Sequence, residues 1–165
     1  MGGGGGGGDW LLPTDNDFFI EGTQRNYTAG VQWGYEFTAD EALSVKATRL
    51  KLTNNEAVQT GTVFLWDQET QGLLASVAVV ASPDPGWSDT FSFSAPIPLT
   101  EGKTYVVSWS MEQSLTEVLV CSNASAVTQF APSPITFIRG RSYSNTQQIP
   151  IGQLSDMRGY LDLLV

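Results

Sequence analysis

The chain has 165 residues, a length that suits one domain with a sizeable hydrophobic core. Eight Lys and Arg residues against 17 Asp and Glu residues give a formal charge of −9, which argues against binding to nucleic acid or to an anionic membrane surface. The sequence has no histidine and one cysteine, which excludes Ser-His-Asp and Cys-His catalysis, a zinc site of imidazole or thiolate ligands, and an internal disulfide.

The chain begins with a glycine-rich leader, MGGGGGGGDW. The leader lacks the basic and apolar regions of a signal peptide, so we expect synthesis and folding in a cytoplasm. No stretch of about 18 apolar residues predicts a membrane span. Glycine loses more backbone entropy on ordering than any other residue. An ordered leader would therefore need the backbone groove or sheet edge of a neighbouring chain, whereas an unheld leader would be a flexible tail or linker.

Apolar side chains follow the glycines and precede the first predicted strand, at positions 10–12 and 18–19. They suit docking onto the chain's own domain or onto a partner, and both alternatives stay open. We therefore predict an extended arm over residues 1–20 and one domain over residues 21–165. The candidate partner-binding residues of the arm are Gly2, Gly3, Gly4, Gly5, Gly6, Gly7, Gly8, Trp10, Leu11, Leu12, Phe18 and Phe19.

From residue 31 onward, short apolar segments separated by turns predict β-strands. The alternation over 31–37 indicates a half-buried strand, and a second strand is expected over 45–52, with a bulge between Ala47 and Leu50. Residues 62–66 are apolar on both faces, as in a central strand. Residues 73–80 follow across the turn at 67–72, which predicts a hairpin.

The second half of the sequence continues the same pattern. Residues 91–93 alternate Phe with Ser, and the strand at 105–111 places Tyr105, Val107, Trp109 and Met111 on one face. Further strands are expected at 118–121, 135–139 and 160–165, while 122–134 and 142–155 are expected to be loops. No ten-residue segment has a helical period. The fold class is therefore all-β, an antiparallel β-sandwich, jelly-roll-like, of about 8–9 strands.

Several runs resemble a β-sandwich domain of unknown function that recurs in bacterial extracellular multidomain proteins, often beside immunoglobulin-like and carbohydrate-active modules. They are WGYEFTA at 33–39, ATRLKL at 47–52, GTVFLW at 61–66, GLLA at 72–75, GW at 86–87, FSF at 91–93, PIPL at 96–99, EGKTYVVSW at 101–109 and GYLDL at 159–163. The resemblance covers residues 31–165 and implies a surface display or adhesion module, and the family has no established catalytic residues to carry over. A stand-alone sandwich with an arm and no secretion signal looks, by analogy, like a virion protein of a tailed bacteriophage.

Two kinds of ligand site have some support in the residues. Asp15, Asn16 and Asp17, and the region of Asp84, offer oxygen ligands for calcium, but they lack the spacing of an EF-hand, and we predict no metal or other cofactor. A sugar site would combine an aromatic ring with hydroxyl-binding amides. The candidate glycan-binding residues are Trp87, Tyr143, Gln147 and Gln148.

The leading hypothesis is a non-enzymatic structural protein of an assembly, a bacteriophage head decoration, fibre or tail-associated component. Its arm would bind other protein subunits, as a homo-oligomer or on a lattice, in a virion made in the host cytoplasm. The alternative is a carbohydrate-binding or adhesin-type β-sandwich at a cell surface. Neither hypothesis involves nucleic acid or a membrane.

Overall fold

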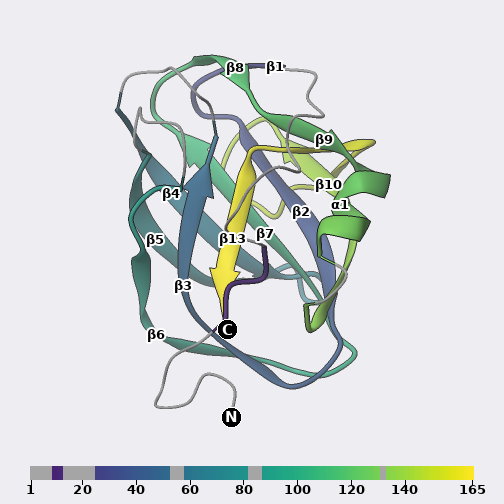
Figure 1. Cartoon of the computed structure of the whole chain (residues 1–165). Coiled ribbons are helices and arrows are strands. Elements are labelled where there is room, and N and C mark those ends of the chain that lie inside the picture. Colours follow the sequence, from purple (N-terminus) through teal and green to yellow (C-terminus); the bar gives the residue numbers. More distant parts are fainter. Residues whose placement is uncertain (1–8, 13–24, 53–57, 82–86, 131–132) are drawn as a thin grey trace.

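The computed structural model describes residues 9–12, 25–52, 58–81, 87–130 and 133–165. In this part of the chain most residues belong to antiparallel strands of two main sheets (Figure 1). The six-stranded sheet has the order β11 (Gly152–Leu154), β10 (Ile135–Tyr143), β2 (Gln32–Ala39), β7 (Thr104–Met111), β4 (Gln59–Asp67) and β5 (Leu73–Ala81). The three-stranded sheet has the order β13 (Tyr160–Leu164), β3 (Leu43–Lys51) and β6 (Phe91–Leu99). The predicted antiparallel β-sandwich is confirmed.

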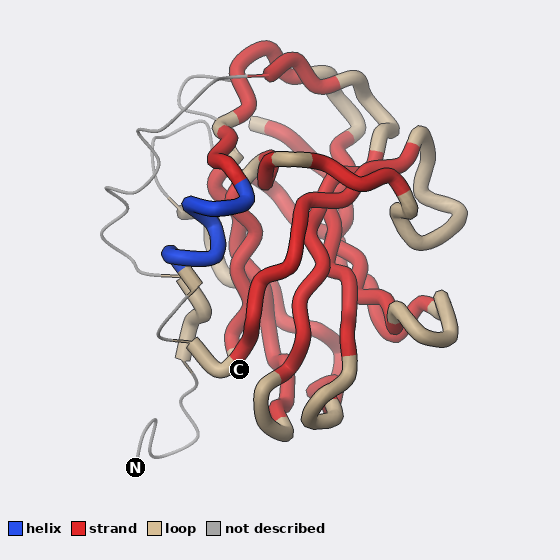
Figure 2. Tube along the Cα trace, turned by 90° about the vertical axis from the view of Figure 1, so that its right-hand side faces the viewer, coloured by secondary structure: helices blue, strands red, loops and turns tan. Residues whose placement is uncertain are grey.

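Smaller elements complete the fold. Two short two-stranded sheets pair β1 (Arg25–Tyr27) with β8 (Leu115–Val118), and β9 (Val120–Ser122) with β12 (Asp156–Arg158). The helix α1 (Asn123–Gln129) lies at the side of the strands (Figure 2). In the described part of the chain no helix is long and apolar enough to cross a bilayer.

The core lies between the two main sheets. Tyr35, Leu65 and Val107 of the six-stranded sheet and Val45 and Leu161 of the three-stranded sheet belong to one buried apolar cluster. The Tyr35 hydroxyl donates a hydrogen bond of 2.7 Å to the Leu161 carbonyl and so joins the sheets inside the core. Each large apolar side chain that is fully buried in this way contributes about 1.5–3 kcal/mol to stability. One face of the six-stranded sheet is therefore used by the core, and the opposite face, turned away from the three-stranded sheet, is the one that could bind a ligand.

The alternation predicted for 105–111 is confirmed, but both faces of this strand are covered. Tyr105, Val107, Trp109 and Met111 belong to the core cluster, whereas Val106 belongs to a second, smaller cluster on the opposite face. Strand β4 also has buried apolar side chains on both faces, with Val63 and Leu65 in the core cluster and Trp66 in the second cluster. It pairs with β5 in the predicted hairpin. Asp67 closes that hairpin, because its Oδ1 accepts hydrogen bonds from the Glu69 and Thr70 amides.

Helix α1 corrects the prediction of a loop over residues 122–134. The helix spans seven residues, too few turns to give a recognisable period in the sequence. Ser122 caps it, since its Oγ accepts a hydrogen bond of 3.1 Å from the Ser125 amide, and Ala126 is buried beneath it. The prolines that suggested a loop, Pro132 and Pro134, both follow the end of the helix.

Two strand details also differ from prediction. The bulge lies between Val45 and Ala47 rather than between Ala47 and Leu50, because the extra residues belong to the paired edge strand β6 and include Pro96, which cannot donate a ladder hydrogen bond. The predicted loop at 142–155 is interrupted by β11, which pairs with the end of β10. Residues 144–151, between β10 and β11, form no regular element.

Candidate functional site

The candidate site lies on the outer face of the six-stranded sheet, the face that is turned away from the three-stranded sheet. Alternation along the strands places Gln32, Glu36, Phe64, Trp66 and Ser108 on this face. Residues 144–151, which we call the strap, contact it. The strap covers part of the outer face and leaves the rest of that face uncovered beside it.

Gln32 holds the strap. Its side chain is fully buried, and its amide nitrogen donates hydrogen bonds of 3.1 and 3.0 Å to the carbonyls of Asn145 and Gln148. Its amide oxygen accepts one of 2.9 Å from the Trp66 indole and another from the Ser108 hydroxyl. Both donors and the acceptor of this amide are therefore used, which fixes its orientation. One side chain thus connects the sheet to two points of the strap.

Two further contacts fix the strap. Ile149 is buried against Trp66 and Val106, in the second apolar cluster. At the far end of the strap, Arg141 donates a hydrogen bond of 3.2 Å to the Ile151 carbonyl. A covering loop with buried contacts at both its middle and its end is well placed to hold a rigid wall.

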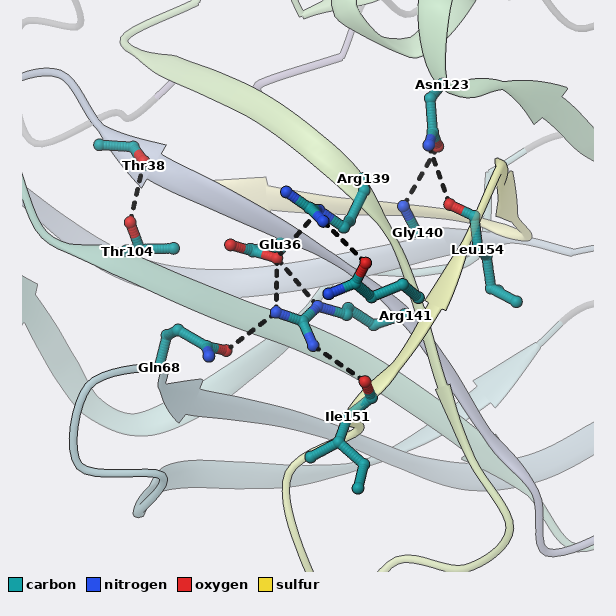
Figure 3. Close-up of polar contacts among 11 residues, drawn as sticks. Glu36, Thr38, Gln68, Thr104, Asn123, Arg139, Gly140, Arg141, Ile151 and Leu154 are labelled. Carbon is teal, nitrogen blue, oxygen red and sulfur yellow. Dashed lines mark hydrogen bonds and ion pairs between the residues drawn. The ribbon is translucent and has the colours of Figure 1, made fainter.

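Arg141 is in turn oriented by Glu36 at the centre of the outer face (Figure 3). The Glu36 carboxylate accepts hydrogen bonds of 2.9 and 2.6 Å from Nε and Nη2 of Arg141, and Arg139 lies 3.5 Å away on its other side. Arg141 Nη2 also reaches the Gln68 side chain, at 3.4 Å. Because Glu36 and Arg141 are buried and paired, we interpret them as structural support rather than as a ligand site.

Beside the strap the outer face is hollowed into a groove of about 550 Å³. This volume is within the range of small-ligand sites in proteins. Four parts of the chain supply the described wall, namely Ala29 and Gly30 before β2, β4, the end of β7 with Glu112, and the strap. The residues that matter for its chemistry are Thr62, Phe64, Ser110, Glu112, Asn145 and Gln147.

The groove combines one aromatic ring with several hydrogen-bonding groups. Phe64 is half-buried and is stacked at 5.9 Å on Trp66, so its ring is held in one orientation. Asn145 Oδ1 accepts a hydrogen bond of 2.9 Å from the Gln147 amide, which shapes the strap where it borders the groove. Hydroxyl, amide and carboxylate groups around a fixed ring can bind a polar ligand that has an apolar face.

The structure separates the four predicted glycan-binding residues. Gln147 lines the groove. Tyr143 pairs with Gln32 and so lies on the same outer face, and Gln148 lies in the strap, where its carbonyl binds Gln32. Trp87 lies elsewhere, against Arg49 of the three-stranded sheet, and does not join the other three.

The prediction missed the residues that β4 and β7 contribute to the groove. Phe64 was expected to be covered, because residues 62–66 are apolar on both faces. The outer face of β4 is indeed covered at Trp66, but the strap stops short of Phe64, which remains half-buried. The signal available in the sequence was the pair of polar residues next to Phe64 on this face, Thr62 on β4 and its ladder partner Ser110 on β7.

Only residues 9–12 of the arm lie in the described part of the chain. They run antiparallel to β13, with hydrogen bonds between Asp9 and Val165 and from the Leu11 amide to the Leu163 carbonyl. Leu11 and Leu12 are buried in the core cluster, so these two leucines have no surface to offer a partner in this conformation. Of the two docking alternatives, the described structure adopts the one onto the chain's own sandwich. Gly2 to Gly8, Phe18 and Phe19 lie outside the described residues, and their role in partner binding stays a prediction.

A buried ion pair holds this segment in place. Arg49 donates to Asp162 through Nε at 2.9 Å and Nη2 at 2.7 Å, and its guanidinium lies 4.2 Å from the ring centres of both Trp10 and Trp87. The Asp162 carboxylate also accepts a hydrogen bond of 2.9 Å from the Leu12 amide. The two tryptophans, one from the arm and one from the loop before β6, therefore enclose the same cation.

Burial raises the pKa of Asp162 to about 6, although Arg49 and the Leu12 amide oppose the shift. The folded protein therefore takes up a proton at a pH at which the unfolded chain, with an ordinary Asp pKa near 3.9, does not. The contribution of Asp162 to the free energy of unfolding should be fully present below about pH 4 and lost as the pH rises through 6. Urea unfolding of the wild type and of Asp162→Asn between pH 4 and 7 measures this. The free energy of unfolding of the wild type should fall relative to that of Asp162→Asn as the pH rises from 4 to 7. A parallel pH dependence in both proteins would contradict it.

The predicted calcium ligands Asp15, Asn16, Asp17 and Asp84 lie outside the described residues. Within the described ranges no three acidic or cysteine side chains come together as a candidate metal site.

Comparison with known proteins found a similar solved structure and a matching family model. A solved structure described as "Xyl-CBM35 in complex with glucuronic acid containing disaccharide" is similar at a TM-score of 0.36 and 12% identity, over 87% of this chain and 95% of that chain. That TM-score is too low to support a conclusion about the ligand of this chain. A search of the curated proteins gave no significant match. A family model described as "Domain of unknown function (DUF4082)" matches residues 20–131, which is more than half of the sequence, and the chain therefore belongs to that family.

Proposed function

We propose that this β-sandwich is a non-enzymatic carbohydrate-binding module and that its ligand lies in the groove on the outer face. The observation that carries the proposal is the groove itself, in which a fixed aromatic ring is surrounded by hydroxyl, amide and carboxylate groups. Sugars present an apolar face of C–H groups and a rim of hydroxyls, and this set of side chains is complementary to both.

The roles of the lining residues follow from their chemistry. Phe64 packs against the apolar face of a sugar ring. Thr62 and Ser110 donate or accept hydrogen bonds at its hydroxyls, and the Gln147 amide can do both at once. The strap does not need to form on binding, because Gln32 and Ile149 already hold it, so little conformational entropy is lost when the ligand binds.

The test is binding of the purified full chain to soluble polysaccharides in affinity gel electrophoresis and isothermal titration calorimetry. Phe64→Ala should weaken the association constant about tenfold or more, equivalent to about 1.4 kcal/mol. Gln147→Ala, at an exposed position where folding is not at risk, should weaken it as well. Phe91→Ala is the matched control, since Phe91 is also half-buried but lies on β6 of the other sheet. Binding that all three variants retain would refute the groove as the site.

The assembly role predicted from the arm stays a prediction. The glycine leader lies outside the described residues, and neither comparison names a phage or virion protein. The described residues favour the groove, because residues 9–12 are used within the chain's own sandwich.

A further inference from the structure

Building on the proposed function, we infer that the groove selects uncharged glycans and rejects acidic ones, and that Glu112 is the residue that sets this preference. The inference rests on how charge is distributed over the outer face and on the surroundings of one carboxylate.

The described part of the groove wall contains no cation. Among the described residues that line it none is Lys or Arg, and Glu112 is the one charged group. The cations described elsewhere on the outer face do not line the groove, and each has a carboxylate partner. Arg141 and Arg139 share Glu36, at 2.6 and 3.5 Å, and Lys103 lies at 2.8 Å from Asp67. An anionic sugar would therefore find no free positive partner at this site.

Glu112 is held so that one of its oxygens can bind a ligand. Its Oε2 accepts a hydrogen bond of 2.8 Å from the Thr60 hydroxyl, and its backbone amide donates one of 2.8 Å to the Thr60 carbonyl. Among the described residues no protein group donates to its Oε1, although the side chain borders the groove and is exposed. An oriented carboxylate oxygen is a strong acceptor for a sugar hydroxyl, because one partner in that hydrogen bond is charged.

The same oxygen repels a carboxylate or sulfate group on a sugar. Two like charges in contact at a protein surface repel each other, because water screens them incompletely at that distance. The net charge of −9 adds a long-range repulsion that salt screens, whereas the contact at Glu112 is screened less. A glycan with free neighbouring hydroxyls and no acidic groups is therefore the ligand class that fits the groove.

The experiment compares neutral polysaccharides (β-glucan, xyloglucan and galactomannan) with acidic ones (polygalacturonate and alginate), at 50 and at 500 mM salt. Wild type should bind a neutral polymer at both salt concentrations and bind the acidic polymers at least ten times more weakly, with a smaller difference at high salt. Glu112→Gln should lower the ratio of the affinity for neutral polymers to the affinity for acidic polymers about fivefold or more. The variant should bind neutral polymers more weakly and acidic polymers more strongly than the wild type does. Glu117→Gln is the control, because it removes the same charge from an exposed position on β8 that is outside the groove.

The outcomes separate this inference from the proposed function. Stronger binding to acidic than to neutral polymers would overturn the inference and leave carbohydrate binding intact. An equal change in Glu112→Gln and Glu117→Gln would also overturn it, since the preference would then follow from net charge alone. If the wild type binds neither class, the proposed function fails and the inference fails with it.

Discussion

Replacing Arg49 with methionine should lower the free energy of unfolding by about 3–5 kcal/mol, because the change leaves the Asp162 carboxylate buried without its counter-charge. The Asp162 side chain is fully buried, and that of Arg49 is 8% exposed. Methionine fills a similar volume, so the loss reports the charge and hydrogen bonds rather than a cavity. Urea unfolding followed by tryptophan fluorescence measures the change at pH 7, where the wild-type carboxylate is ionised.

Arg25→Met is the control for this prediction. Arg25 also forms an ion pair, at 3.2 Å with Asp156, but its side chain is 45% exposed. Asp156 keeps a second partner, Arg158 at 2.8 Å. An exposed pair of this kind contributes about 0–1 kcal/mol, so Arg25→Met should be nearly neutral. If Arg49→Met costs no more than Arg25→Met, the buried pair does not stabilise the fold.

The same substitution tests how the arm is attached. The Arg49 guanidinium contacts the Trp10 ring, and its Nη2 donates a hydrogen bond of 3.2 Å to the Leu12 carbonyl. Without Arg49, residues 9–12 lose both contacts, although their hydrogen bonds to β13 remain. If Arg49 holds this segment, the Leu11 and Leu12 amides should exchange faster in Arg49→Met than in the wild type, and at a lower free energy than global unfolding. Unchanged exchange at these two amides would show that Arg49 does not hold it.

The strands were predictable because their signal is local. An alternation such as that at 105–111 reports which side chains face the core, and the hairpin at 59–81 follows from a short polar turn between two apolar runs. The coverage of the outer face at Trp66 was also visible in the sequence, since Trp66 is apolar where a solvent-facing strand would be polar, but Phe64 on the same face is only half-buried.

The candidate site was only partly predictable because its contacts are distant in sequence. Gln147 was predicted to bind a ligand because it lies in a polar loop. The position of that loop depends on Gln32, which binds the carbonyls of two loop residues that are 113 and 116 residues further along the chain. The partner of Arg49 is likewise 113 residues away, at Asp162. Alternation along a strand gives the face on which a side chain lies, but it does not give the loop that will cover that face.

Gln32→Glu should abolish binding in the groove while the sandwich stays folded. Glutamate keeps an oxygen that can accept from the Trp66 indole and the Ser108 hydroxyl. It loses only the amide nitrogen that donates to the Asn145 and Gln148 carbonyls, and it places a carboxylate oxygen against them. A buried polar group left without its partner costs about 1–3 kcal/mol, and a charge costs more, so the strap should separate from the sheet. We expect at least about 100-fold weaker binding to the neutral polysaccharides and faster proteolysis within residues 144–148.

A pH profile distinguishes loss of the strap from general destabilisation. A glutamate facing two carbonyls has a raised pKa, and its protonated form regains one donor, so binding by Gln32→Glu should recover in part as the pH is lowered towards 5. Gln153→Glu is the control: Gln153 is exposed on β11 and accepts from Arg139, and its replacement should leave binding unchanged. Full binding by Gln32→Glu at pH 7 would refute the role of Gln32 in holding the strap. Weak binding without any recovery at low pH would show that the substitution acts through the fold as a whole. Within the described residues the amide nitrogen of Gln32 is the donor that both strap carbonyls share, so its loss removes both hydrogen bonds at once.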